Sequence, residues 1–154
     1  MRLANVAIGA YLKNDMITEA ESVLNEANKR SKGPFCWAWE MFMVFFLKKH
    51  QIDYALKCME AAVSAAEDNE WHPKSESIDK LLKYFKEDKD VNGAEELCKM
   101  LKKVNRLDSK AYHSLLHTYV ASGKPEPDMH RRMEADGLEM NLDIENLLEK
   151  FFPS

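Results

Sequence analysis

The sequence predicts an all-α fold, a right-handed α-solenoid of about four stacked helix-turn-helix repeats closed by a C-terminal capping helix. A motif of an aromatic residue, a short polar turn and an alanine recurs, beginning at Tyr11, Phe46 and Phe85. A fourth aromatic residue, Tyr119, continues the series, so the steps are 35, 39 and 34 residues. Periods of this size are typical of stacked helical repeats. Runs of β-branched residues that would favour strands are nearly absent.

The first predicted repeat spans about residues 1–35 and contains two helices. The first helix is expected from Arg2 to Asn14, and its apolar stripe at helical spacing consists of Leu3, Val6, Ala7, Ala10 and Tyr11. Thr18 is expected to cap the second helix, because Thr18 and Glu21 have the spacing of a capping box. Gly33-Pro34 is expected to end the repeat, since proline cannot continue a helix.

Three further repeats are expected at about residues 36–74, 75–107 and 108–141, followed by a capping helix at 142–154. Asp53 and Asn92 are the predicted N-caps within the second and third repeats, and Asp108-Ser109 opens the fourth. The whole chain is then a single helical-repeat domain. Because Met1 falls inside a predicted helix without a cap, we expect the chain to be the C-terminal part of a longer protein.

Composition excludes several classes of protein. The chain has 22 basic and 26 acidic residues, and the excess of acid lies from Glu126 onward, with 8 acidic and 3 basic residues. The rest is near neutral, which differs from the strongly basic surface of proteins that bind nucleic acid by charge alone. Three widely spaced cysteines predict neither a disulfide framework nor a zinc site, and indicate a reducing compartment. No apolar run is long enough to span a membrane, and no transit peptide is visible.

The recurring residues resemble the pentatricopeptide repeat family. Three features carry the match: an aromatic residue and a lysine end the first helix, an acidic residue and an alanine open the second, and Gly-Pro closes the repeat. In the first repeat these residues are Tyr11, Lys13, Glu19-Ala20 and Gly33-Pro34. In the second repeat the matching residues are Phe46, Lys48 and Ala55. The segments Trp39-Glu40, Lys89 to Glu96 and Ser122-Gly123-Lys124 are similar to the short P-type subgroup of plant mitochondria. The resemblance implies a mitochondrial location, with the chloroplast as the alternative.

The resemblance also implies binding of RNA, with one base read per repeat by two or three side chains. The reading positions fall in pairs, one pair per repeat, on Asn5 and Phe35, Glu40 and Lys74, Asp79 and Leu107, and His113 and Asn141. Asn5 alone is a usual reader, while Glu40 and Asp79 would repel phosphate. The lysine near the backbone phosphates is retained at Lys13 and Lys48. The fold is therefore expected to carry over, but base reading is not.

Several other residues have both a functional and a structural interpretation. His113 and His117 lie four residues apart, but no third ligand accompanies them, so no metal site is expected. Lys83 is the centre of a basic strip with a lysine three residues to either side, which indicates either phosphate contact or a solvated helix face. Trp37 is expected to be exposed and to contact a partner or stack on RNA, whereas Trp39 is expected in the core. Arg131-Arg132 is expected to be ordinary surface.

Two functions follow from these observations. The first is a mitochondrial protein that binds single-stranded or structured RNA in RNA processing, stability or translation, with Asn5, Lys13, Lys48, Lys83 and His113 contacting the RNA. The second is a protein–protein scaffold or a structural component associated with the organellar ribosome, in which Trp37 contacts the partner. No set of nucleophile, base and orienting group appears, so neither an enzyme, a cofactor nor a small-molecule substrate is expected.

Overall fold

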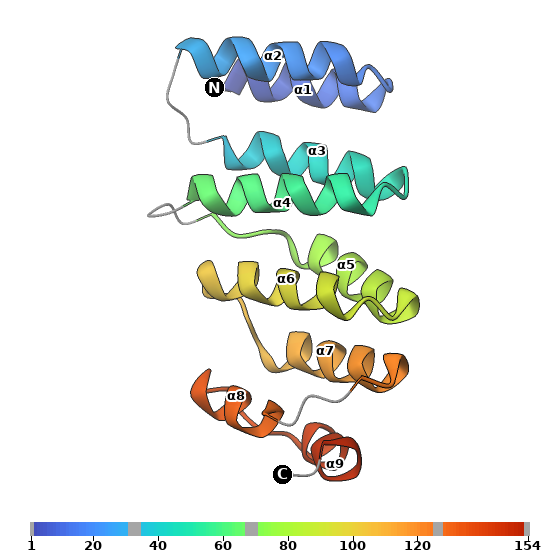
Figure 1. Cartoon of the computed structure of the whole chain (residues 1–154). Coiled ribbons are helices and arrows are strands. Elements are labelled where there is room, and N and C mark those ends of the chain that lie inside the picture. The colour runs from blue at the N-terminus through green and yellow to red at the C-terminus, as the bar shows by residue number, and fades with distance from the viewer. Residues whose placement is uncertain (1, 31–34, 67–70, 125–127, 153–154) are drawn as a thin grey trace. The chain divides into compact units, whose positions relative to one another are not determined.

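The computed structural model describes residues 2–30, 35–66, 71–124 and 128–152, and these residues form nine α-helices and no strand (Figure 1). The helices are α1 Arg2–Lys13, α2 Ile17–Arg30, α3 Cys36–Lys48, α4 Ile52–Ala66, α5 Ser75–Asp88, α6 Val91–Lys103, α7 Ser109–Ser122, α8 Met129–Ala135 and α9 Leu142–Phe151. The predicted all-α helical-repeat fold is confirmed. The predicted repeat end at Gly33-Pro34 lies outside the described residues.

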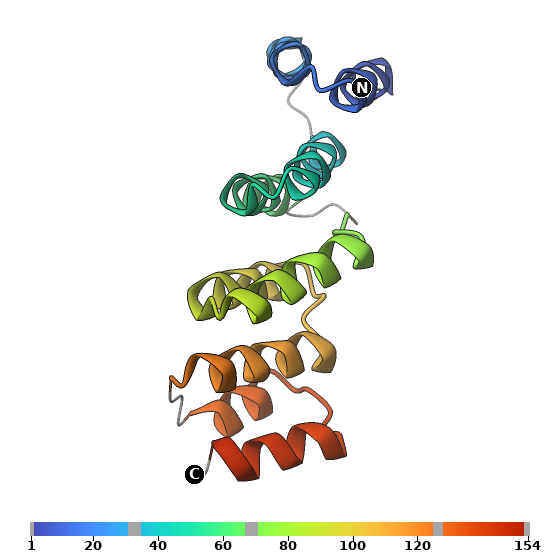
Figure 2. The ribbon, with the colours of Figure 1, turned by 90° about the vertical axis from the view of Figure 1, so that its right-hand side faces the viewer.

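The chain consists of two compact units, residues 1–77 and 78–154. In the first unit, α1 pairs with α2 and α3 pairs with α4, and α1 also packs against α3. Figure 2, which looks nearly along these helices, shows α1 and α3 on one side of the unit and α2 and α4 on the other. In the second unit, α7 packs against both α6 and α9.

The recurring aromatic residue marks one repeated turn. The carbonyl oxygen of Tyr11 accepts a hydrogen bond from the amide of Met16, and the same bond over five residues joins Phe46 to Gln51 and Phe85 to Asp90. In each turn the residue before the donor is in the left-handed region, with φ of 59° at Asp15, 58° at His50 and 57° at Lys89. These features define a Schellman motif, which stops one helix and sets the direction of the next.

The recurring alanine follows the aromatic residue by nine positions, at Ala20, Ala55 and Ala94, and it is completely buried or nearly so in each repeat. Its amide donates the first hydrogen bond of the second helix, to the carbonyl of the residue just before that helix. A larger side chain there would separate the two helices of the pair, which explains the recurrence.

The predicted N-caps at Thr18, Asp53 and Asn92 are wrong. The second helices begin at Ile17, Ile52 and Val91, so all three residues lie inside the first helical turn. Asp90 is the cap of α6, where its side chain accepts a hydrogen bond from the amide of Gly93 at 2.9 Å. In each repeat the second helix therefore begins two positions earlier than the predicted capping residue would place it, directly after the turn that contains the left-handed residue.

The predicted apolar stripe of α1 is wrong in part, because Ala7 and Tyr11 are half-buried but Ala10 is exposed. Leu3 and Val6 are 85% and 67% exposed, whereas Ile8 and Leu12 are buried. Because α1 has apolar residues on most sides, helical spacing alone could not select the face that packs. The stripes of the later helices are closer to expectation, since Leu81, Leu82 and Phe85 in α5 and Tyr112, Leu115, Leu116 and Tyr119 in α7 are buried.

Candidate nucleic-acid interface

A groove of about 560 Å³ lies in the first unit between α1 and α3. Asn5, Gly9, Leu12 and Lys13 come from α1, Trp37, Glu40, Met41, Val44, Phe45 and Lys48 from α3, and Lys74 from the segment before α5. The groove therefore brings together four of the six residues that the sequence singled out for binding, namely Asn5, Lys13, Trp37 and Lys48.

Helical spacing explains why these residues share one groove. Counted from the first lining residue of each helix, the other lining residues follow after three, four, seven, eight or eleven positions. These spacings place them on one face of the helix. The helices α1 and α3 run in the same direction (Figure 1). They approach closely at Gly9, where an added Cβ would lie 3.6 Å from the sulfur of Met41. In this register Asn5 lies level with Trp37, and Lys13 lies near the other end of the groove with Lys48.

The groove has an apolar floor and a basic rim. Leu12, Met41, Val44 and Phe45 are buried or half-buried and supply the floor, while the rim lysines Lys13, Lys48 and Lys74 are exposed. None of these three lysines forms an ion pair with another described residue, unlike Lys49, which lies 2.8 Å from Asp15. Uncompensated lysines beside an apolar surface suit a ligand with phosphates and flat bases.

Trp37 is the exposed aromatic side chain of the groove, at 56%. The prediction that it is exposed is confirmed, while its partner role stays a prediction. Trp39 was expected in the core, but it is only half-buried and packs on Phe42 with ring centroids 6.1 Å apart. The first turn of α3 therefore presents one indole to solvent and uses the other for packing.

Glu40 is the acidic residue of the groove, and its carboxylate is hydrogen-bonded to other residues of the protein. Its side chain is only 3% exposed. One carboxylate oxygen accepts a hydrogen bond from the indole N–H of Trp71 at 3.2 Å, and the other accepts from the backbone amide of Lys74 at 2.7 Å. The sequence places Glu40 where its charge would repel phosphate, and in the structure both of its oxygens accept hydrogen bonds from partners within the protein. This pair of bonds also holds Lys74 at the edge of the groove.

Most of the other predicted reading positions are also occupied within the protein. Phe35 is buried, and the Asp79 carboxylate lies 3.0 Å from the ammonium of Lys110. The Asn141 side chain caps α9 by accepting a hydrogen bond from the amide of Ile144 at 2.9 Å. Of the polar residues at these positions, Asn5 and Lys74 line the groove, and neither side chain forms a hydrogen bond with another residue in the part of the chain that the structure describes.

Lys83 and His113 belong to the second unit and are not among the residues that line the groove. Lys83 is exposed on α5. His113 is half-buried and its ring contacts that of His117, with centroids 4.5 Å apart. Burial, helped by the charges of His113 and Lys86, lowers the pKa of His117 below its ordinary value. Within the described ranges, no group of three or more His, Cys, Asp or Glu side chains could hold a metal ion.

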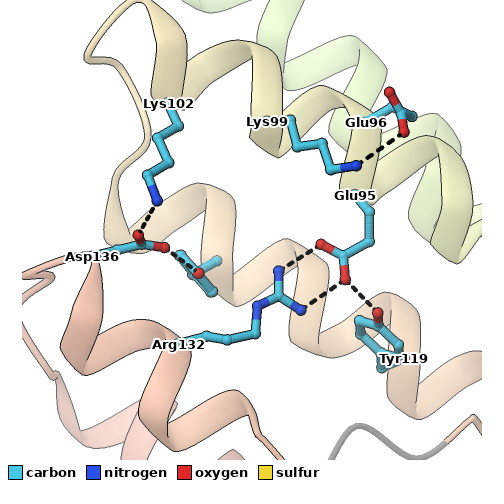
Figure 3. Close-up of polar contacts among 8 residues, drawn as sticks. Glu95, Glu96, Lys99, Lys102, Tyr119, Arg132 and Asp136 are labelled. Carbon is cyan, nitrogen blue, oxygen red and sulfur yellow. Dashed lines mark hydrogen bonds and ion pairs between the residues drawn. The ribbon is translucent and has the colours of Figure 1, made fainter.

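The expectation of ordinary surface at Arg131-Arg132 is wrong for Arg132. Its guanidinium binds the Glu95 carboxylate at 2.8 and 2.6 Å, and the hydroxyl of Tyr119 donates to the same carboxylate (Figure 3). Beside it, Asp136 accepts from the hydroxyl of Tyr112 at 2.5 Å and pairs with Lys102 at 2.7 Å. These bonds join α6 and α7 to α8 and to Asp136 just after it, so we assign them to stability rather than to ligand binding.

The three cysteines are buried and unbridged. Burial raises the pKa of Cys58 and of Cys98 to about 12, so these thiols stay protonated at neutral pH. A protonated thiol is a poor nucleophile and a poor metal ligand. The described helices include none that is long and apolar enough to cross a membrane.

No family model matches the chain, but individual proteins of Arabidopsis thaliana are similar to it. Two mitochondrial pentatricopeptide repeat-containing proteins are 47% and 42% identical over 99% of the chain. A large ribosomal subunit protein is 35% identical over 97% of the chain. The matched region makes up 30%, 29% and 31% of these three relatives, so the chain spans about three tenths of their length.

Proposed function

Because the chain belongs to the pentatricopeptide repeat family, we propose that it is part of a mitochondrial protein that binds single-stranded RNA, and that the groove between α1 and α3 holds the RNA. The observation that carries the proposal is the convergence of Asn5, Trp37 and three lysines on one groove. No catalytic step is part of it. The biological setting is the processing, stability or translation of mitochondrial RNA.

The electrostatics of the groove suit a polyanion, and its apolar floor favours RNA over an acidic protein surface. The whole chain has a formal net charge of −4, so attraction of a polyanion must be local. Lys13, Lys48 and Lys74 supply that local charge, and the buried Glu40 is engaged by Trp71 and the Lys74 amide. The apolar floor adds a surface on which bases can lie, which a purely electrostatic site would not need.

Salt dependence tests the proposal. Three phosphate contacts on a single strand give a log–log slope of about −2, so affinity should fall roughly 20-fold between about 50 and 200 mM salt. The double variant Lys13→Ala with Lys48→Ala keeps one of the three lysines, and its affinity should fall only about threefold over the same range. Fluorescence anisotropy with a labelled single-stranded RNA measures both values.

The matched control is Lys29→Ala with Lys57→Ala. It removes the same charge from the same unit, but neither lysine lines the groove, and Lys29 and Lys57 contact Glu26 and Tyr54. The proposal expects the control to keep the wild-type slope. Equal loss of slope in both double variants would mean that net charge, not the groove, attracts RNA, and it would contradict the proposal.

The scaffold function is a second candidate, because one relative is named as a large ribosomal subunit protein. In that case the exposed Trp37 contacts a protein of the assembly. It predicts co-sedimentation with the mitochondrial large subunit that Trp37→Ala abolishes, together with no measurable binding of free RNA. Binding of free RNA that depends on Lys13 and Lys48 would favour the first function.

A further inference from the structure

We propose that His113 and His117 on α7 form a two-ligand site for a divalent transition-metal ion that binds its ligands at right angles, such as Ni²⁺ or Cu²⁺. Both histidines lie in the second unit, and neither lines the groove between α1 and α3. The site is therefore independent of the proposed RNA binding. The neutral imidazole of histidine is a common ligand of both ions.

The spacing of the two histidines brings their rings together. Residues four positions apart lie on the same face of a helix, one turn above the other. The ring centroids are 4.5 Å apart, with an angle of 67° between the ring planes. Because α7 has 14 residues and is capped by Asp108 at its start and by the left-handed Gly123 at its end, the helix backbone maintains this spacing.

The distance between the rings fits two imidazoles bound to one ion at a right angle. A bound nitrogen lies about 2.1 Å from the metal and the ring centre about 1.1 Å farther, so each ring centre is about 3.2 Å from the ion. A right angle at the ion then separates the ring centres by about 4.5 Å, whereas the tetrahedral angle of zinc requires about 5.2 Å. Ions with square-planar or octahedral coordination therefore fit the observed pair.

Both rings are available to an ion. The two histidines are half-buried, and within the described part of the chain no hydrogen bond engages a nitrogen of either ring. The three cysteines, which would compete for such ions, are buried. Lys86 is the opposing charge, since it is close enough to act on His117, but it is exposed, so solvent and salt screen its effect.

The sequence predicts no metal site because a third protein ligand is missing, and the described residues contain no group of three ligands. That argument applies to a closed zinc site, in which the protein supplies every ligand. Water can complete the coordination of Ni²⁺ or Cu²⁺, so two neighbouring imidazoles make an open site that binds more weakly than a closed one.

Isothermal titration calorimetry of the chain, without a histidine tag, measures the binding of Ni²⁺. The proposal expects a single ion per chain. His113→Gln and His117→Gln should each weaken the affinity at least about tenfold, because one imidazole alone loses the effective concentration of the second. His72→Gln is the matched control, since His72 is exposed and has no histidine within four positions, and it should leave the affinity unchanged. Mg²⁺, which prefers oxygen ligands, should not bind.

Lys86→Gln distinguishes a cation from an anion at this site. Removal of the positive charge should strengthen Ni²⁺ binding, by about twofold for an exposed charge, whereas a phosphate held by the same histidines would bind more weakly. Weaker binding of Ni²⁺ to this variant would contradict the proposal.

Nuclear magnetic resonance of the wild-type chain provides a measurement that needs no variant. Paramagnetic Ni²⁺ should broaden the ring signals of His113 and His117 and leave those of His72 sharp. Absence of Ni²⁺ binding to the wild-type chain, equal binding by the two histidine variants, or broadening confined to other residues would each overturn the site. None of these results bears on RNA binding, so the two proposals fail separately.

Discussion

Arg132 holds the carboxylate of Glu95 with both terminal nitrogens, Nη1 at 2.8 Å from Oε2 and Nη2 at 2.6 Å from Oε1. The two side chains are 32% and 22% exposed, so the pair is partly shielded from water. Since α8 has only seven residues, this bidentate contact with α6 does much to keep the helix in place.

Replacing Arg132 with alanine should lower the free energy of unfolding by about 1–3 kcal/mol, because it leaves a half-buried carboxylate without its main partner. Arg132→Lys should restore only part of the loss, since an ammonium cannot bind both oxygens. Lys99→Ala is the control. Its pair with Glu96 on the same helix has side chains 72% and 55% exposed, so the change should be below about 0.5 kcal/mol. Urea unfolding followed by circular dichroism measures all three.

The same network predicts loss of stability in acid. Burial raises the pKa of the Glu95 carboxyl, but hydrogen bonds from Arg132 and Tyr119 outweigh it and hold the pKa below its usual value. For Asp136, burial is likewise outweighed by Lys102 and Tyr112. Because the pKa values are lower in the folded protein, the unfolded chain takes up protons first, at about pH 4.

The lowered pKa of His117 should cost some stability as the pH falls below about 6.5, and the two carboxyls should make stability decline further as the pH falls below about 4. Thermal unfolding at a series of pH values measures this. Glu95→Gln should be less stable at pH 7 and should show a shallower decline in acid, because it lacks one of the two shifted carboxyls. A decline in the variant as steep as in the wild type would show that Glu95 does not contribute.

Gly93 should not tolerate a side chain. A Cβ there would overlap the ring of Phe85 and lie 2.7 Å from Oδ2 of Asp90, the cap of α6. Gly93→Ala should destabilise the protein by about 1–3 kcal/mol despite the better helix propensity of alanine. Gly9→Ala is the contrasting variant, because its Cβ would meet only Met41 at 3.6 Å. That variant should be neutral or more stable by up to about 1 kcal/mol, as denaturant unfolding would reveal.

Glu40→Ala should destabilise the first unit. It would leave the indole N–H of Trp71 and the amide of Lys74 without their acceptors, which costs about 1–3 kcal/mol. Amide hydrogen exchange provides the local measurement, because exchange at Lys74 should accelerate while exchange at the Gly93 amide, bonded to Asp90 in the second unit, should not. Unchanged protection at Lys74 would contradict the assigned hydrogen bond.

The repeat architecture could be predicted from the sequence because its signal is periodic. Tyr11, Phe46 and Phe85 recur with Ala20, Ala55 and Ala94, and each of these pairs brackets the same turn in the structure. The N-caps could not be predicted in this way. Thr18 and Asp53 have side chains that can cap a helix, but the helices begin earlier because Asp15 and His50 adopt the left-handed conformation. The residue types at these two positions do not indicate that conformation.

The groove was only partly predictable. Lys13, Lys48 and Asn5 follow from the repeat position, and Trp37 from its place off the apolar stripe. Lys74 was assigned to a reading position without any indication that its own amide is fixed by Glu40, because that bond joins residues 34 positions apart. The pairing of Arg132 with Glu95 joins residues 37 positions apart, and patterns within a single helix or turn cannot predict a contact over that separation.

Nuclear magnetic resonance of the three indole N–H groups during titration with single-stranded RNA tests directly whether RNA occupies the groove. Trp37 is exposed in the groove, Trp39 is half-buried, and the indole of Trp71 is bonded to Glu40, so substitution of each tryptophan by phenylalanine assigns the three signals. If RNA lies in the groove, the Trp37 signal should shift or broaden as RNA is added, while the Trp71 signal should stay in place. Bound RNA that leaves the Trp37 signal unchanged would contradict binding in the groove.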